Sequence, residues 1–147
     1  MDTKIEKNLW GAAIREAGHV ALALQHDLVV GHIWIEAHGG GGSEIQDPSK
    51  KQLKDIDQLA LCYAGGVAQK HFKAPTNCRA MREDCKRANK ITEHQPVKER
   101  RATKRAGYER AQEIVVGNRD ELRRLAEFII PRRRIHISDV QPPIRLK

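Results

Sequence analysis

Residues 8–26, NLWGAAIREAGHVALALQH, predict the helix on which the rest of the fold depends. Small residues, with Gly18 among them, permit a second backbone to approach closely, since a glycine inside a helix otherwise costs about 1 kcal/mol. Three polar side chains, Arg15, Glu16 and His19, interrupt the apolar stretch within little more than one turn. Apolar residues recur at steps of three and four, as in a helix with one buried face: Leu9, Ala13, Ala17, Val20 and Leu24.

The pentapeptide Arg15-Glu16-Ala17-Gly18-His19 differs at one position from His-Glu-x-x-His, the signature of a helical zinc peptidase site. In the intact signature two histidines one turn apart hold the metal, and the glutamate acts as general base on the bound water. Glu16 and His19 are in place, but Arg15 stands where the first histidine belongs. A guanidinium has no lone pair to donate and stays charged, so the first metal ligand is missing.

The remaining chain predicts a mostly α fold, a helical bundle with a small β-hairpin, in a single domain over 1–147. Residues 28–37 are β-branched and aromatic and predict a strand, and the run Gly39–Gly42 predicts the turn to a short second strand at 43–46. The turn residues 47–49 follow. We expect 131–147 to form an irregular tail with a short helical turn at 138–140. Apolar periodicity and helix-stop signals predict four further helices, at 51–72, 78–94, 97–117 and 120–130.

The composition predicts a hydrophobic core of aliphatic side chains and a protein that resides in a reducing compartment. Only six residues are Phe, Trp or Tyr. The three cysteines, Cys62, Cys78 and Cys85, form no Cys-x-x-Cys pair, and we expect them to be small buried side chains. No run approaches the roughly 20 apolar residues of a membrane span, and the polar N-terminus does not resemble a signal peptide. We therefore expect a cytoplasmic protein with no membrane partner.

Charge is distributed unevenly along the chain, whose formal net charge is +8. Residues 1–69 hold six Lys/Arg and nine Asp/Glu, whereas residues 70–147 hold twenty-one and ten. A basic half of this kind attracts nucleic acid or acidic partners. Because most of these charges alternate with glutamate at helical spacing, we favour the explanation that they form the solvated outer faces of amphipathic helices.

Two further stretches give the chain a resemblance to FtsH family zinc peptidases. Residues 64–69, AGGVAQ, resemble that family's Gly-Gly-Arg-Ala-Ala-Glu stretch, and residues 84–89, DCKRAN, are similar to its Asn-Asp-Leu-x-Arg-Ala-Thr segment. The order and spacing of these segments, the glycine-rich hairpin and the closing helix pair at 97–130 also agree. The resemblance covers roughly residues 8–140 and implies an FtsH-peptidase-like, zincin-like fold.

The resemblance also implies roles for individual residues. Glu16 matches the general base, His19 the second histidine ligand and Asp84 the aspartate that is the family's third zinc ligand, with the fourth position left to water. Zinc is thus the implied cofactor, and Arg15 argues against it. The family joins this domain to an ATP-driven module and membrane helices, for which this chain has no room. It contains no G-x-x-x-x-G-K-[ST] loop, so we expect a stand-alone domain without an ATP site.

Three outcomes for the metal position follow from the sequence: a weak or rebuilt metal site, an arginine that replaces the metal, or an Arg15 side chain that points to solvent. His32, on the predicted strand, or His38, at its glycine turn, is a candidate substitute ligand. Alternatively, the Arg15 guanidinium fills the metal position and neutralises Glu16 and Asp84, which would otherwise repel each other.

Three functions are compatible with these patterns. The first is a catalytically impaired or inactive FtsH-peptidase-like domain that binds a peptide or protein, with Ile33, Trp34 and Ile35 of the predicted strand as the edge that pairs with an extended peptide. The second is an active zinc endopeptidase with a substitute ligand. The third is a basic nucleic-acid-binding protein, suggested by the run Arg132-Arg133-Arg134, with weak and non-specific binding expected.

Overall fold

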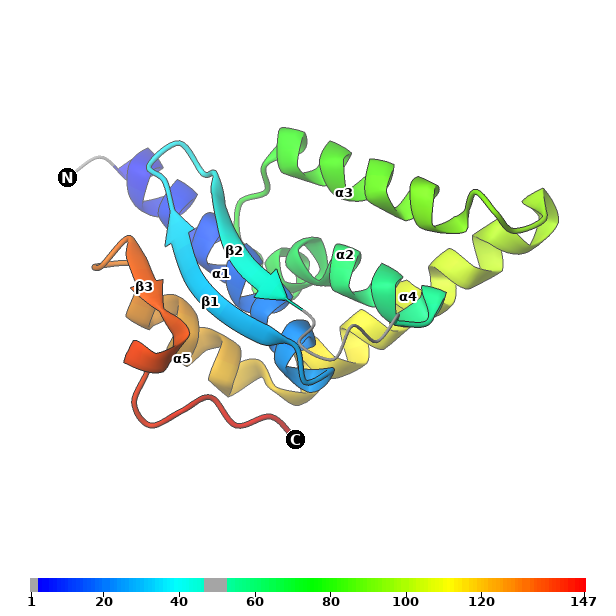
Figure 1. Ribbon diagram of the computed structural model, residues 1–147. Coiled ribbons are helices and arrows are strands. Elements are labelled where there is room, and N and C mark those ends of the chain that lie inside the picture. The colour runs from blue at the N-terminus through cyan, green and yellow to red at the C-terminus, as the bar shows by residue number, and fades with distance from the viewer. Residues whose placement is uncertain (1–2, 47–52) are drawn as a thin grey trace.

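The computed structural model describes residues 3–46 and 53–147. The predicted mostly helical fold with a small sheet is confirmed within these ranges (Figure 1). The turn predicted at 47–49 lies outside the described residues. The elements follow in the order α1 (Thr3–Gln25), β1 (Val29–Ile35), β2 (Gly41–Gln46), α2 (Asp55–His71), α3 (Cys78–Thr92), α4 (Val97–Gly117), α5 (Arg119–Ile129), β3 (Arg134–His136) and the 3-10 helix η1 (Ile137–Asp139).

Helix α1 forms the centre of the fold, as its apolar pattern predicts. It packs against α2, α5 and the inner face of the sheet, and nearly every residue from Leu9 to Ala23 is buried. Gly18 permits the close approach to α2, because a Cβ at this position would lie 2.5 Å from the carbonyl oxygen of Ala64. The buried hydrophobic residues of the described chain are all Leu, Ile, Val or Ala, which confirms the expected aliphatic core.

The three strands form one antiparallel sheet in the order β2-β1-β3. The C-terminal segment is irregular only in part: residues 134–136 pair with β1 and η1 follows directly, whereas residues 140–147 form no helix or strand. Apolar Ile135 is drawn into the core opposite Ile33, and a three-residue strand carries too little periodicity to be recognised in the sequence. The predicted helical turn lies one residue earlier than expected.

The pairing also corrects the predicted peptide-binding edge. Ile33 pairs with Ser43 on one side and Ile135 on the other, and Trp34 pairs with Gly42 and Arg134. The Ile35 amide donates to the carbonyl of Arg133 at 2.8 Å. Residues 33–35 thus belong to the central strand and have no free edge, whereas β2 lies at the edge of the sheet.

Helices α2 and α4 pack together closely, and α3 lies more loosely over them. Gly107 of α4 lets the two helices meet, since a Cβ there would lie 2.5 Å from the Leu59 Cβ. Helix α3 buries only Asp84, Ala88 and Thr92. Together, α3 and the first half of α4 extend away from the sheet (Figure 1).

The cysteines depart from the expectation of burial. Cys78 and Cys85 are exposed on α3, and Cys62 is half-buried. The amphipathic helix α3 turns only a narrow face to the core, which leaves the thiols of Cys78 and Cys85 outside it.

Among the described residues, no helix has both the length and the hydropathy that crossing a membrane requires.

Candidate functional site

Helix α1 presents Arg15, Glu16 and His19 toward α2, α3 and β2. Arg15 and His19 are four residues apart and therefore share a helix face. Gly65 of α2 packs against this face, where a Cβ would lie 2.6 Å from both the Arg15 Cγ and the His19 Nε2. Steric crowding thus explains why position 65 is a glycine, since a larger side chain there would collide with Arg15 and His19.

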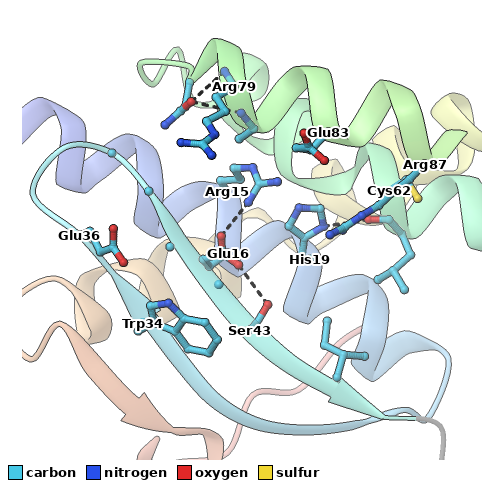
Figure 2. A pocket seen from close by; sticks show the side chains of 18 of the residues that line it. Arg15, Glu16, His19, Trp34, Glu36, Ser43, Cys62, Arg79, Glu83 and Arg87 are labelled. Atoms are coloured by element: carbon cyan, nitrogen blue, oxygen red, sulfur yellow. Dashed lines mark hydrogen bonds and ion pairs between the residues drawn. The ribbon is translucent and has the colours of Figure 1, made fainter.

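The Arg15 guanidinium joins the two carboxylates of the site. Its Nη1 donates to Glu16 Oε2 at 2.9 Å, and its Nη2 lies 3.1 and 3.2 Å from the two carboxylate oxygens of Asp84. Ser43 Oγ of β2 donates to the other Glu16 oxygen at 3.0 Å. Figure 2 shows Arg15 and Ser43 on either side of Glu16. One network therefore links α1, β2 and α3 through a nearly buried glutamate.

Burial and charge act in opposite directions on the two carboxylates. Burial raises the pKa of Glu16 above its ordinary value, while Arg15 and the hydrogen bond from Ser43 act to lower it. Burial likewise raises the pKa of Asp84 against the effect of Arg15. Charge-assisted hydrogen bonds of the lengths found here stabilise the ionised forms. Removal of Arg15 would take away the largest effect that opposes burial at both carboxylates.

His19 is held in one tautomer. Its Nδ1 lies 2.8 Å from the carbonyl oxygen of Leu61, which can only accept, so Nδ1 carries the hydrogen. The Nε2 atom is buried and has no hydrogen-bond partner among the described residues. Burial lowers the pKa of His19 to about 4, and the charges of Arg15 and Arg87 act in the same direction. At neutral pH the side chain therefore offers an uncharged nitrogen with a free lone pair.

Arg15, Glu16, His19 and Ser43 line a cleft of about 800 Å³. The glycine turn and β2 form one wall, and α3 forms the other (Figure 2). Arg79, Glu83 and Arg87, spaced four residues apart, line the α3 wall. Apolar lining comes from Ile45, Leu61 and Ile91, and burial raises the pKa of the Cys62 thiol in the same cleft to about 11. A thiol of that pKa is protonated at neutral pH and is a poor nucleophile.

The donor set of this site does not fit a catalytic zinc ion. Such an ion needs three protein ligands, and the site offers His19 Nε2 and Asp84. The position of the third ligand is occupied by Arg15, whose guanidinium cannot bind a metal and already contacts Asp84. No group of three or more His, Cys, Asp or Glu within residues 3–46 and 53–147 is arranged to hold a metal ion.

Neither candidate substitute ligand supplies the missing donor. His32 lies outside the cleft: its Nδ1 contacts Glu44 at 2.7 Å, and its ring packs edge-on against His136. His38 does line the cleft, but its Nδ1 accepts from the Gly40 amide and its Nε2 pairs with Glu36. The interpretation that Arg15 neutralises Glu16 and Asp84 agrees with the observed contacts.

The structure brings together four residues that the sequence predicted for the site: Arg15, Glu16, His19 and Asp84. It also places in the site several residues that the sequence analysis did not identify. Ser43 was part of the predicted second strand, and its contact with Glu16 depends on which face of that strand turns inward. The residues Arg79, Glu83 and Arg87 repeat at a helical interval that could have been recognised as one face of α3.

Comparisons of this chain with the models of known protein families and with curated proteins give no match. The likeness to the FtsH peptidase domain therefore rests on the short motifs and their order in the chain.

Proposed function

We propose that this chain is an FtsH-peptidase-like domain in which Arg15 takes the place of the zinc ion, and that it binds an extended peptide in the cleft without hydrolysing it. The observation that carries the proposal is the bridging position of the guanidinium, with one nitrogen on Glu16 and the other on Asp84. A fixed organic cation of this kind preserves the charge balance of a metal site while offering no Lewis acid.

The state of Glu16 supports a loss of hydrolytic activity. A general base must accept a proton from water, and here both carboxylate oxygens are already hydrogen-bonded, one to Arg15 and one to Ser43. The side chain is only 2% exposed. Peptide hydrolysis would require this network to open first.

The geometry of β2 supports peptide binding. It is an edge strand, and its second edge has no partner among the described strands. Edge strands accept extended peptides through main-chain hydrogen bonds. Gly41 and Gly42 begin the strand and line the cleft, so no side chains at these positions obstruct an approaching backbone. This edge replaces the one that we predicted at residues 33–35.

A binding and cleavage assay with fluorescent reduced casein, which lacks stable tertiary structure, tests both parts of the proposal. We expect saturable binding by anisotropy, and no new fragments by mass spectrometry with or without added zinc. Ala80→Trp, which fills the cleft from α3, should weaken binding at least tenfold. Ala102→Trp on the exposed face of α4 is the matched control and should bind like the parent.

Hydrogen exchange identifies where the peptide lies. On casein binding, the amides of β2 should exchange more slowly, because an added strand accepts hydrogen bonds from them.

The second candidate function, an active zinc peptidase, is favoured by the free lone pair of His19. Zinc-dependent cleavage that Glu16→Gln abolishes would establish that function and contradict ours. Binding that Ala80→Trp leaves unchanged would place the peptide elsewhere.

A further inference from the structure

The helical hairpin formed by α3 and the first half of α4 carries much of the positive charge of the molecule. Residues 78–105, which we call the basic arm, contain ten Lys/Arg and four Asp/Glu. One of those four, Asp84, is already engaged by Arg15. The tip of the arm, where α3 connects to α4, extends away from the sheet (Figure 1). Arg79 and Arg87 of the arm line the cleft, whereas six other cations of the arm are absent from the cleft lining: Arg82, Lys86, Lys90, Lys98, Arg101 and Arg105.

On α4, three basic residues form a solvent-exposed stripe. Lys98, Arg101 and Arg105 are spaced by three and four residues and are all exposed. Gly107, which is buried, lies on the opposite side of the helix from Lys98 and Arg105. At 3.6 residues per turn, Glu99 falls outside the stripe, about a quarter turn from Lys98. The stripe is thus positive along its length of roughly 10 Å, at a rise of 1.5 Å per residue.

A matching stripe lies on α3. Arg82, Lys86 and Lys90 are spaced four residues apart and are exposed. The Lys104 Nζ donates to Asn89 Oδ1 and connects the two helices near the tip of the arm. By helical spacing, the α3 stripe lies on the side of that helix opposite its buried residues Asp84, Ala88 and Thr92. Both helices of the arm therefore carry a row of exposed cations.

These cations are largely without neutralising partners. None of the ion pairs formed by the described residues involves Arg82, Lys90 or any member of the α4 stripe. Lys86 lies 3.6 Å from Glu83, but both side chains are more than half exposed, and such pairs are weak. The six charges are therefore available to an external polyanion.

We propose that the basic arm binds the phosphate backbone of duplex nucleic acid without reading its sequence. Rows of exposed Lys and Arg suit the phosphate backbone of a duplex, whose affinity for cations comes from counterion release. Single strands are held largely by stacking on aromatic side chains. Residues 78–105 contain no Phe, Trp or Tyr, which favours a duplex over a single strand.

Fluorescence anisotropy with a labelled 24-base-pair duplex of arbitrary sequence tests this proposal. We expect binding at 25 mM KCl that weakens steeply with salt. Six cations set a limit of about −5 on the slope of log affinity against log salt. The variant Arg101→Glu/Arg105→Glu should bind at least tenfold more weakly at 100 mM KCl, with a slope shallower by about 2.

The matched control is Arg145→Glu/Lys147→Glu, which changes the net charge equally at two exposed C-terminal side chains. It should bind within a factor of about two of the parent, and circular dichroism verifies that all proteins are folded. Equal losses in both variants would mean that overall charge, not the arm, attracts the duplex. An absence of binding at 25 mM KCl, or equal competition by an acidic polypeptide of the same charge, would also overturn the proposal.

Discussion

The Arg15 guanidinium and the Asp84 carboxylate lie 3.1 Å apart although 69 positions separate the two residues in the sequence. The pair joins α1, the most buried helix, to α3, which contributes only three buried side chains to the core. Because α3 buries so little apolar surface, we expect this ion pair to contribute much of the free energy that holds α3 against α1. It also sets the position of one wall of the cleft.

Replacing Arg15 by alanine should therefore destabilise the protein by about 2–4 kcal/mol, since removing one partner of a buried pair leaves the other charge stranded. The side chains of Arg15 and Asp84 are only 13% and 8% exposed, so solvent screens them little. Urea unfolding of parent and variant measures the difference. The control Arg87→Ala removes an exposed guanidinium from the cleft wall and should change stability by less than about 0.5 kcal/mol.

A double-mutant cycle separates the ion pair from other effects of the substitution. Arg15→Ala combined with Asp84→Asn relieves the stranded charge, so the double variant should be more stable than the sum of the single losses predicts. An Arg15→Ala variant with the parent's denaturant midpoint would show that the guanidinium lies in solvent.

The substitution Arg15→His should create a zinc site. It would place a third donor one turn before His19, whose Nε2 already has a free lone pair, and it would release Asp84 from its ion pair. We expect zinc affinity to rise by at least two orders of magnitude, measured by competition with a chelating dye. A folded variant that binds zinc no better than the parent would mean that the three donors do not converge.

Much of the fold could be predicted because its helices repeat apolar residues over three or more turns. Helix α4 has the predicted bounds, α3 ends two residues before its predicted end, and α1 begins at Thr3 instead of residue 8. The strand β3 escaped prediction because three residues define no period, and its place beside β1 depends on contacts between distant parts of the chain. That missed pairing also made β1 look like an edge strand.

The site was predictable where a local motif carried it and unpredictable where register decided it. The spacing of Arg15, Glu16 and His19 on one helix placed these residues together. The partners of His32 could not be foreseen, because they depend on which face of β1 turns outward and on Glu44 of the neighbouring strand. A bulge between Val30 and Ile33 shifts the pairing register of β1 with β2, and the sequence contains no pattern that predicts this bulge.

The adjacent glycines of α2 should respond oppositely to alanine. Gly65→Ala would place a Cβ 2.6 Å from Arg15 Cγ and His19 Nε2, and we expect a loss of about 1–3 kcal/mol from this overpacking. Gly66→Ala meets no atom within 4 Å and should stabilise the helix by about 0.5–1 kcal/mol. Thermal and urea unfolding measure both. Two variants of equal stability would contradict the close packing of Gly65 on the site.

The buried His19 should make stability depend on pH. Because its pKa falls from 6.5 to about 4 on folding, the folded state binds fewer protons than the unfolded state between these values. Its contribution is fully present above pH 6.5 and is lost as the pH falls toward 4, by up to about 3 kcal/mol at 1.36 kcal/mol per pKa unit.

The variant His19→Gln isolates this effect, because glutamine does not titrate. Glu16 and Asp84, whose pKa values are raised by burial, act in the opposite direction, since they favour the folded state as the pH falls. They remain in both proteins, so their effect largely cancels in the difference. Urea unfolding at pH 7.5, 6, 5 and 4.5 should show the parent losing its advantage over the variant step by step. An advantage that stays constant across this range would mean that His19 gains a proton in the folded protein as readily as in the unfolded chain, and that its Nε2 is open to water.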